Sequence, residues 1–197
     1  MSFINDKTKE INCKIVYYGP PLCGKSTSLR RIYGEVHRGA KGEMVSLSQD
    51  DDRTLYFDFV PLNLGSVGGY TIRLHLYTVP GEVGYQQSRA LISKGVDGVV
   101  FVADSQLERM ESNLKSLSSL KEILRQEGHA WGEVPCVYQY NKRDLPNAVP
   151  VEELRRYLNA EGGEDFESIA TDGSGTFEAF RAISTKVLHE LKKHTKG

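Results

Sequence analysis

The sequence predicts an α/β fold built on a mostly parallel, doubly wound sheet with one antiparallel hairpin. Strand patterns alternate with helical patterns along the chain, which is typical of strands joined by crossover helices. The stretch "VDGVVFVADS", residues 96–105, contains a continuous apolar run, as expected of a central parallel strand covered on both faces. The stretch "GPPLCGKS", residues 19–26, matches the phosphate-loop pattern G-x-x-x-x-G-K-[ST] between a predicted strand and a predicted helix.

The first half of the chain predicts three strands and two helices. Apolar runs predict strands over residues 11–19, 54–64 and 70–79, and the last two are joined around "GSVGG", a hairpin signal. Apolar residues recur at helical spacing over about residues 25–37, and a short helix is expected over 90–94. Residues 44–47 have some strand character within a polar loop.

The second half continues the alternation. A stripe of Met110, Leu114, Leu117, Leu120 and Leu124 predicts a helix after the central strand. "PCVYQYNKRD" contains another buried strand, and "PVEELRRYL" begins a helix with a proline and two acids in its first turn. The last strand is expected in "FESIATDG", and the last helix over residues 177–191. Ligands of such sheets bind at the carboxyl ends of the strands.

The composition is that of an ordinary soluble globule with one domain over residues 1–197. Hydrophobic residues make up 39% and charged residues 26%, and the net charge of −1 argues against a nucleic-acid binder. There is no bilayer-spanning apolar run, no signal-peptide core and no lipidation motif. The three cysteines are scattered, which fits a reducing compartment and offers no metal spacing. We therefore expect a cytoplasmic protein without a direct membrane anchor.

The phosphate loop is the most informative motif. Backbone N–H groups at a helix N-terminus curl around phosphates, the Lys25 ammonium reaches the terminal phosphates, and the Ser26 hydroxyl is placed to bind Mg²⁺. Pro20 and Pro21 each remove an N–H at the start of the loop, but the donors of its second half are intact. The predicted phosphate-binding residues in this loop are Gly19, Leu22, Cys23, Gly24, Lys25, Ser26 and Thr27. Cys23 is either a small packing residue or an oxidisable thiol with a lowered pKa.

The stretch "NKRD", residues 141–144, predicts guanine selection. A carboxylate at Asp144 can accept two parallel hydrogen bonds from guanine, and adenine has no such donor pair. Asn141 would brace the loop, and the stem of Lys142 could lie over the base. A backbone N–H of Ala170 or Thr171 is expected to meet the guanine carbonyl. Taken alone, Asp144 could instead belong to a simple turn before Pro146.

With these motifs in order, the chain resembles the small Ras-like GTPases, and within them the MglA family of bacterial polarity and gliding motility. The residues that carry the resemblance are "EINCKIVYYGP", "DRTLYFDFVPL", "LHLYTVPG", "KGVDGVVFVADS" and "YNKRDLPNAV", which span most of the chain. The resemblance implies a GTP-regulated switch with Mg²⁺ and bound GTP or GDP. It also implies a roadblock-fold activating partner, MglB-like and dimeric, together with polarity effectors and recruitment to the cell poles.

The same resemblance assigns roles around the γ-phosphate. Thr54 is similar to the threonine that reaches Mg²⁺ and the γ-phosphate, so the expected metal ligands are Ser26 and Thr54. Arg53 resembles a built-in arginine finger that neutralises transition-state charge; the alternative is a solvated charge answering the neighbouring acidic run. Gly81 would offer its N–H to the γ-phosphate.

Two positions depart from what the resemblance implies: Pro21 and Glu82 stand where this family usually carries Gly and Gln. Thr78 stands where most small GTPases carry Asp, but it belongs to "TVPG", the stretch most specific to the resemblance to MglA. An ionised Glu82 can only accept hydrogen bonds, and at 4 Å and an effective dielectric of 20 it interacts with a phosphate charge by about 4 kcal/mol. The site could raise the pKa of Glu82 so that it acts as a donor, or Glu82 could point to solvent. Asp58 is a candidate replacement for the missing acid.

Two functions remain open from the sequence. One is a slow, partner-stimulated GTPase with Arg53, Gly81 and Glu82 as catalytic residues. The other is a GTP-binding polarity scaffold whose hydrolysis is largely lost through Glu82 and Pro21. The guanine selector argues against an ATPase or kinase. Asp104 is interpreted as a residue that shapes the loop after its strand.

Overall fold

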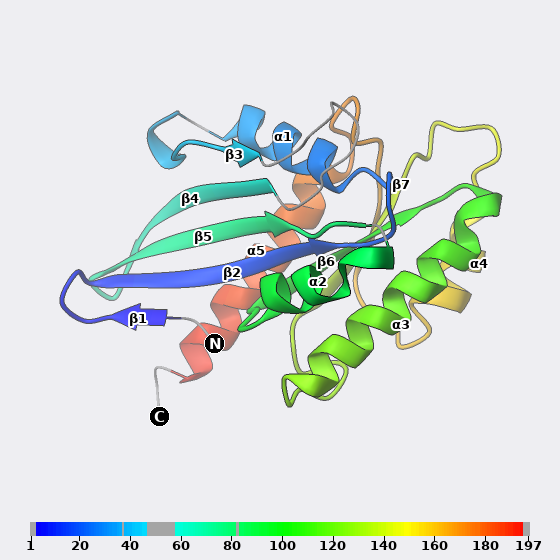
Figure 1. Ribbon diagram of the computed structural model, residues 1–197. Coiled ribbons are helices and arrows are strands. Elements are labelled where there is room, and N and C mark those ends of the chain that lie inside the picture. The colour runs from blue at the N-terminus through cyan, green and yellow to red at the C-terminus, as the bar shows by residue number, and fades with distance from the viewer. Residues whose placement is uncertain (1–2, 37, 47–57, 82, 195–197) are drawn as a thin grey trace.

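A computed structural model describes residues 3–36, 38–46, 58–81 and 83–194 of the chain (Figure 1). Within these ranges eight strands form one sheet in the order β3-β4-β5-β2-β6-β7-β8, with β1 paired to β2. The strands are β1 (Phe3–Asn5), β2 (Glu10–Tyr18), β3 (Val45–Ser46), β4 (Asp58–Val67), β5 (Tyr70–Thr78), β6 (Gly98–Asp104), β7 (Cys136–Asn141) and β8 (Asp165–Glu167). From β5 through β2, β6 and β7 to β8 every neighbouring pair is parallel, which confirms the predicted sheet.

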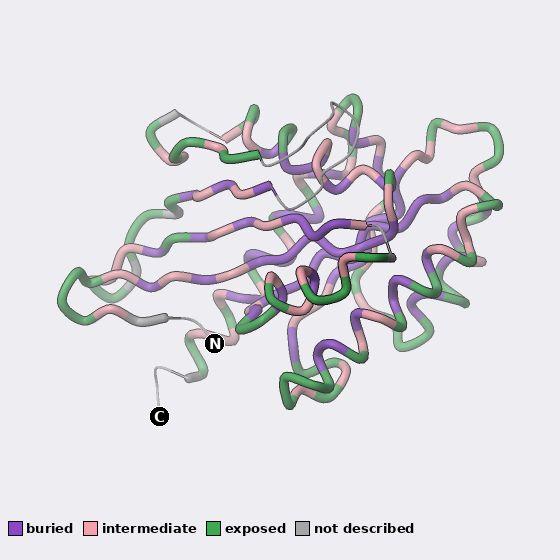
Figure 2. The backbone as a smooth tube through the Cα atoms, viewed as in Figure 1, coloured by how far each residue is buried: buried purple, intermediate pink, exposed green. Residues whose placement is uncertain are grey.

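Helices cover both faces of the sheet. They are α1 (Lys25–Glu35), α2 (Gln86–Ser93), α3 (Met110–Gln126), α4 (Val151–Leu158) and α5 (Thr176–His194). In the burial view β2 and β5 alternate between buried and more accessible residues, and the helices alternate between buried and exposed turns (Figure 2). All seven residues of β6 are buried, as its unbroken apolar sequence predicts. Across the described ranges, no helix combines the length and the apolar character that crossing a bilayer requires.

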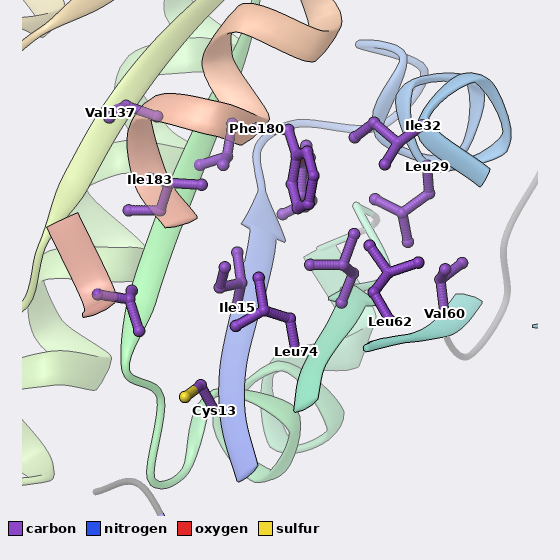
Figure 3. Packing of buried hydrophobic residues seen from close by; sticks show 14 of the residues in the cluster. Cys13, Ile15, Leu29, Ile32, Val60, Leu62, Leu74, Val137, Phe180 and Ile183 are labelled. Carbon is purple, nitrogen blue, oxygen red and sulfur yellow. The ribbon is translucent and has the colours of Figure 1, made fainter. Parts of the chain in front are cut away.

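Two hydrophobic layers hold these helices against the sheet. On one face Leu29 and Ile32 of α1 and Phe180 and Ile183 of α5 converge on strand residues such as Ile15 (Figure 3). The other face packs against α3 and α4; its contributing helix residues are Leu117, Leu120, Ile123, Leu124, Val151, Leu154 and Leu158. Both layers fix the helices that follow β2, β6 and β7, and so they fix the loops at the carboxyl ends of these strands.

The predicted hairpin joins β4 and β5, and its two glycine groups have different roles. Gly68 and Gly69 have φ angles of 60° and 83° and form the two-residue turn between the paired residues Val67 and Tyr70. Gly65, with a φ angle of 90°, lies where the pairing shifts by one residue between Asn63 and Ser66. The stretch "GSVGG" therefore encodes a bulge followed by a turn.

Several boundaries differ from the sequence prediction. Helix α2 begins at Gln86, four residues earlier than predicted. The sequence prediction missed this first turn because it is polar and carries no apolar periodicity. Strand β8 ends at Glu167, after which Ile169 pairs locally with Ser174 and the chain leaves the sheet. Strand β4 continues to Val67, and the start predicted for it at residue 54 lies outside the described residues. The antiparallel pairs β1–β2 and β3–β4 were not predicted, since both involve strands of three residues or fewer.

Two glycines provide a matched test of this packing. A Cβ at Gly98 of β6 would lie 2.5 Å from Val187 Cγ2 and 3.0 Å from Ile183 Cδ1, so Gly98→Ala should overpack the contact with α5 and destabilise the protein by about 1–3 kcal/mol. A Cβ at Gly34 of α1 would meet nothing within 4 Å, so Gly34→Ala should be neutral or stabilise by up to about 1 kcal/mol. Urea unfolding monitored by circular dichroism measures both; equal effects would contradict the packing described for β6.

Candidate nucleotide-binding site

The phosphate loop connects β2 to α1 with a strongly curved backbone. Leu22 has a φ angle of 62° and Gly24, the residue before the first helical turn, one of 102°. A Cβ at Gly24 would lie 2.1 Å from Asn141 Nδ2, so only glycine allows this close approach to the neighbouring loop. The loop therefore has the curvature that the motif predicts, with its N–H groups at the start of a helix.

The Lys25 side chain folds back across this loop. Its ammonium donates to the carbonyl oxygens of Gly19 at 3.0 Å and Pro20 at 2.7 Å, and only 6% of the residue is exposed. Burial lowers the pKa of Lys25. Burial also raises the pKa of the Cys23 thiol, which supports the packing interpretation of Cys23 and contradicts the oxidisable one.

Gly81 lies directly against the start of the phosphate loop. A Cβ there would approach Pro21 Cα to 2.4 Å and the Pro20 carbonyl carbon to 2.8 Å, so the backbones touch at this point. The segment after β5 and the phosphate loop are thus packed together, with Pro21 at the contact. Arg53, Thr54 and Glu82 lie outside the described residues, so their predicted roles remain predictions.

Asp58 and Thr78 form a buried pair at the adjoining ends of β4 and β5. The Thr78 hydroxyl donates to Asp58 Oδ2 at 3.0 Å and accepts from the Asp58 N–H at 2.7 Å. The Ser46 hydroxyl donates to Asp58 Oδ1 at 2.5 Å. Both Asp58 and Thr78 are fully buried. A carboxylate is thus present beside position 78, one strand across from where the acid of most small GTPases would stand.

Asn141 connects the phosphate loop to the segment that follows β8. Its Nδ2 donates to the Cys23 carbonyl at 2.7 Å, and its Oδ1 accepts from the Ala170 N–H at 2.8 Å and the Ser168 hydroxyl at 3.2 Å. The bracing role predicted for Asn141 has this geometry. One of the two N–H groups expected to meet the guanine carbonyl, that of Ala170, is engaged by Asn141.

Lys142 and Asp104 form an ion pair beside this loop. Lys142 has a φ angle of 66°, and its Nζ lies 2.7 Å from Oδ2 of the fully buried Asp104. Asp104 also accepts from the Gln106 N–H at 3.1 Å, and its own N–H donates to Asn113 Oδ1 at 3.0 Å. Asp104 therefore shapes the loop after β6, as interpreted from the sequence, and it also positions the Lys142 side chain.

A cavity of about 210 Å³ opens between these loops. Its walls come from three separate parts of the chain: Leu22, Gly24, Thr27, Asn141, Lys142, Asp144, Leu145, Ile169, Ala170 and Thr171. All five residues predicted to bind guanine are among them, together with three of the phosphate loop. Asp144 is exposed at this wall, with its carboxylate accessible to a ligand.

Sequence reasoning missed one support of the phosphate loop. Arg109, at the start of α3, donates to the Pro21 carbonyl at 2.6 Å, and its Nε lies 3.7 Å from Asp104. No spacing rule links Arg109 to the motif, because the contact depends on how α3 packs. A larger groove of about 900 Å³ lies at the opposite ends of β7 and β8, beside α5, and it contains none of the predicted residues.

The comparisons with known proteins agree with this geometry. The model of the ADP-ribosylation factor family matches residues 2–187. The chain is 56% identical over 193 residues to the mutual gliding-motility protein MglA of Myxococcus xanthus, covering 98% of this chain and 99% of that protein.

More distant relatives belong to the same fold group. The Ras-related protein Rab-5B of Plasmodium falciparum is 22% identical over 94% of this chain and 82% of its own length. The human ADP-ribosylation factor-like protein 4A is 30% identical over 45% of this chain and 42% of its own length. With its phosphate loop, guanine motif and sheet order, the chain belongs to the ADP-ribosylation factor family of Ras-like small GTPases and groups within it with MglA.

Proposed function

We propose that the chain is a GTP-binding switch that hydrolyses GTP slowly and is stimulated by a partner protein. The observation that carries this proposal is the cavity in which phosphate-loop residues and the Asn141–Asp144 segment meet. The alternative is a GTP-binding polarity scaffold with little hydrolysis, and the hydrolysis measurements below distinguish the two. The similarity to a mutual gliding-motility protein supports a role in bacterial cell polarity and motility.

Guanine would be held between the two loops that Asn141 joins. The exposed Asp144 carboxylate would accept from guanine N1–H and the exocyclic amine. The Lys142 stem would lie along the base, because its ammonium is held by Asp104. Since the Ala170 N–H is engaged by Asn141, Thr171 is the better candidate for the donor to the guanine carbonyl.

The phosphates would be held by the N–H groups of the loop and by Lys25. On binding, the Lys25 ammonium would exchange its two carbonyl partners for phosphate oxygens. The available oxygen donors suit Mg²⁺, which prefers hydroxyl, carboxylate and phosphate oxygens. Ser26 and Thr54 would hold this ion, and the ion would neutralise charge on the phosphates.

Hydrolysis would depend on Gly81, Arg53 and Glu82. The Gly81 N–H would reach the γ-phosphate from its position against Pro21. Arg53 would neutralise charge that develops in the transition state. Glu82 would orient the attacking water but, when ionised, could not donate to the phosphate, which is the reason to expect a low intrinsic rate.

The expected partners rest on the resemblance to MglA. They are a dimeric roadblock-fold activating protein of the MglB type and polarity effectors, with the protein in the cytoplasm and recruited to the cell poles. A partner would act most directly on the segments around Arg53 and Glu82, since these carry the groups that hydrolysis needs.

Replacing Asp144 by Asn tests the base selector. The amide would keep the shape but place an NH₂ donor against the guanine donors, so the affinity for GDP should fall at least about 100-fold. Fluorescent-nucleotide titration measures it. Asp172→Asn is the matched control, because Asp172 is exposed on the neighbouring loop, where it accepts from the Ser174 N–H. Unchanged GDP affinity in Asp144→Asn would contradict the base assignment.

Replacing Arg53 by Ala should slow single-turnover GTP hydrolysis at least about 100-fold and weaken GTP binding less than about 5-fold, because a finger acts on transition-state charge. Arg73→Ala is the control, since Arg73 lies on β5 and pairs with Glu10 at the surface. Equal losses in binding and hydrolysis would point to a binding role for Arg53.

Replacing Glu82 by Gln should speed hydrolysis about 10-fold, because the amide can both accept from the water and donate to the phosphate. The measurement is phosphate release in a single turnover, with and without the roadblock partner. A slower or unchanged rate would show that Glu82 is no handicap, and hydrolysis absent from every variant would favour the scaffold function.

A further inference from the structure

Gln139 is a buried polar residue in the middle of β7, on the sheet face that packs against α1 and α5. It is fully buried, and two residues earlier Val137 belongs to the hydrophobic layer on that face. Gln139 is paired in register with Val102 of β6, another apolar core residue. An apolar side chain would be the ordinary choice here, because burying an amide costs free energy unless its hydrogen bonds are made.

The amide NH₂ of Gln139 makes two hydrogen bonds to elements on either side. It donates to the Ser28 hydroxyl at 3.0 Å and to the Ser168 hydroxyl at 3.0 Å. Ser28 lies in the first turns of α1 and itself donates to the Gly24 carbonyl at 3.0 Å. Ser168 follows β8 and donates to Asn141 Oδ1 at 3.2 Å.

These bonds close a ring that includes two residues of the cavity wall, Gly24 and Asn141. The ring runs from Gly24 through Ser28, Gln139 and Ser168 to Asn141, which returns to the phosphate loop at the Cys23 carbonyl. Asn141 is itself part of the cavity wall, whereas Gln139 acts on it through Ser28 and Ser168. Together they fix the phosphate loop relative to the loop that carries Ala170 and Thr171.

The other end of the Gln139 amide indicates what the residue is for. Its Oε1 is buried and accepts no hydrogen bond from any described residue. An unsatisfied buried carbonyl destabilises a protein, so stability alone does not account for a glutamine at this position. The two bonds from its NH₂ are the feature that an apolar residue could not supply.

We propose that Gln139 is a positioning residue that sets how long a guanine nucleotide stays bound. Gln139 holds the phosphate loop and the loop that carries Ala170 and Thr171 at a fixed separation, so that phosphates and base are bound at the same time. The inference rests on the proposed GTP-binding function and deepens it. Gln139 touches no reacting group, so it affects nucleotide release and not the hydrolysis step.

The test is the dissociation rate of a fluorescent GDP from Gln139→Leu, measured by chase with excess GDP. We expect release to be at least about 10-fold faster, with single-turnover hydrolysis of bound GTP unchanged within about 2-fold. The preference for GDP over ADP, whose base carries an amine where guanine has its carbonyl, should also fall, because the loop that carries Thr171 is less well positioned. A destabilised core alone would not change this preference.

Asn159→Leu is the matched control. Asn159 is also a buried amide that braces a loop, donating to the Gly163 carbonyl at 2.6 Å and accepting from the Gly163 N–H at 2.7 Å, but it lies away from the cavity. It should lower thermal stability and leave GDP release unchanged. Equal acceleration in Asn159→Leu, or release from Gln139→Leu within about 2-fold of the parent, would overturn the proposal.

Two milder variants keep the test decisive if Gln139→Leu does not fold. Ser28→Ala and Ser168→Ala each remove one partner of the amide and should each speed GDP release several-fold. Adding either change to a folded Gln139→Met variant should have a smaller effect than in the parent, because only the bond to Gly24 or Asn141 is then left to lose, and fully additive effects would overturn the proposal. If the parent protein binds no guanine nucleotide, the proposed function fails; if the parent binds GDP and all variants release it slowly, only this inference fails.

Discussion

The hydrogen bonds of the Asn141 amide are the constraint on which the candidate site depends. A parallel sheet brings the carboxyl ends of β2, β6, β7 and β8 to one edge, but it does not fix the loops that follow them. Asn141, the last residue of β7, joins the loop after β2 to the segment after β8 through the Cys23 carbonyl and the Ala170 N–H. The Asn141 amide fits beside Gly24 only because Gly24 has no Cβ. The two motifs that the sequence separates by more than a hundred residues thereby form one cavity.

Much of this arrangement could be predicted because it is local in the sequence. The phosphate loop is a continuous motif, and the central strand is apolar without interruption, so the curvature at Gly24 and the burial of β6 follow from short-range patterns. The NKRD motif likewise identified one of the three chain segments that line the cavity, including Asp144. Short-range rules suffice where a single segment supplies the whole feature.

The remainder depends on packing between distant segments, which no spacing rule encodes. Arg109, just before α3, supports the Pro21 carbonyl from 88 residues away in the chain, and the use of the Ala170 N–H by Asn141 depends on how two loops meet. The hairpin glycines show the same limit on a smaller scale. Their composition predicted a turn, whereas the separate bulge at Gly65 follows from the pairing of β4 with β5.

The reciprocal hydrogen bonds between Asp58 and Thr78 have an evolutionary consequence. The Thr78 hydroxyl donates a hydrogen bond to the Asp58 carboxylate and accepts one from the Asp58 N–H, and both residues are buried. A lone change of Thr78 to Asp would set two carboxylates side by side, and a lone loss of Asp58 would leave this corner without an acid. Each single-step intermediate is therefore disfavoured, so the two positions should change together in any lineage that moves the acid from one strand to the other.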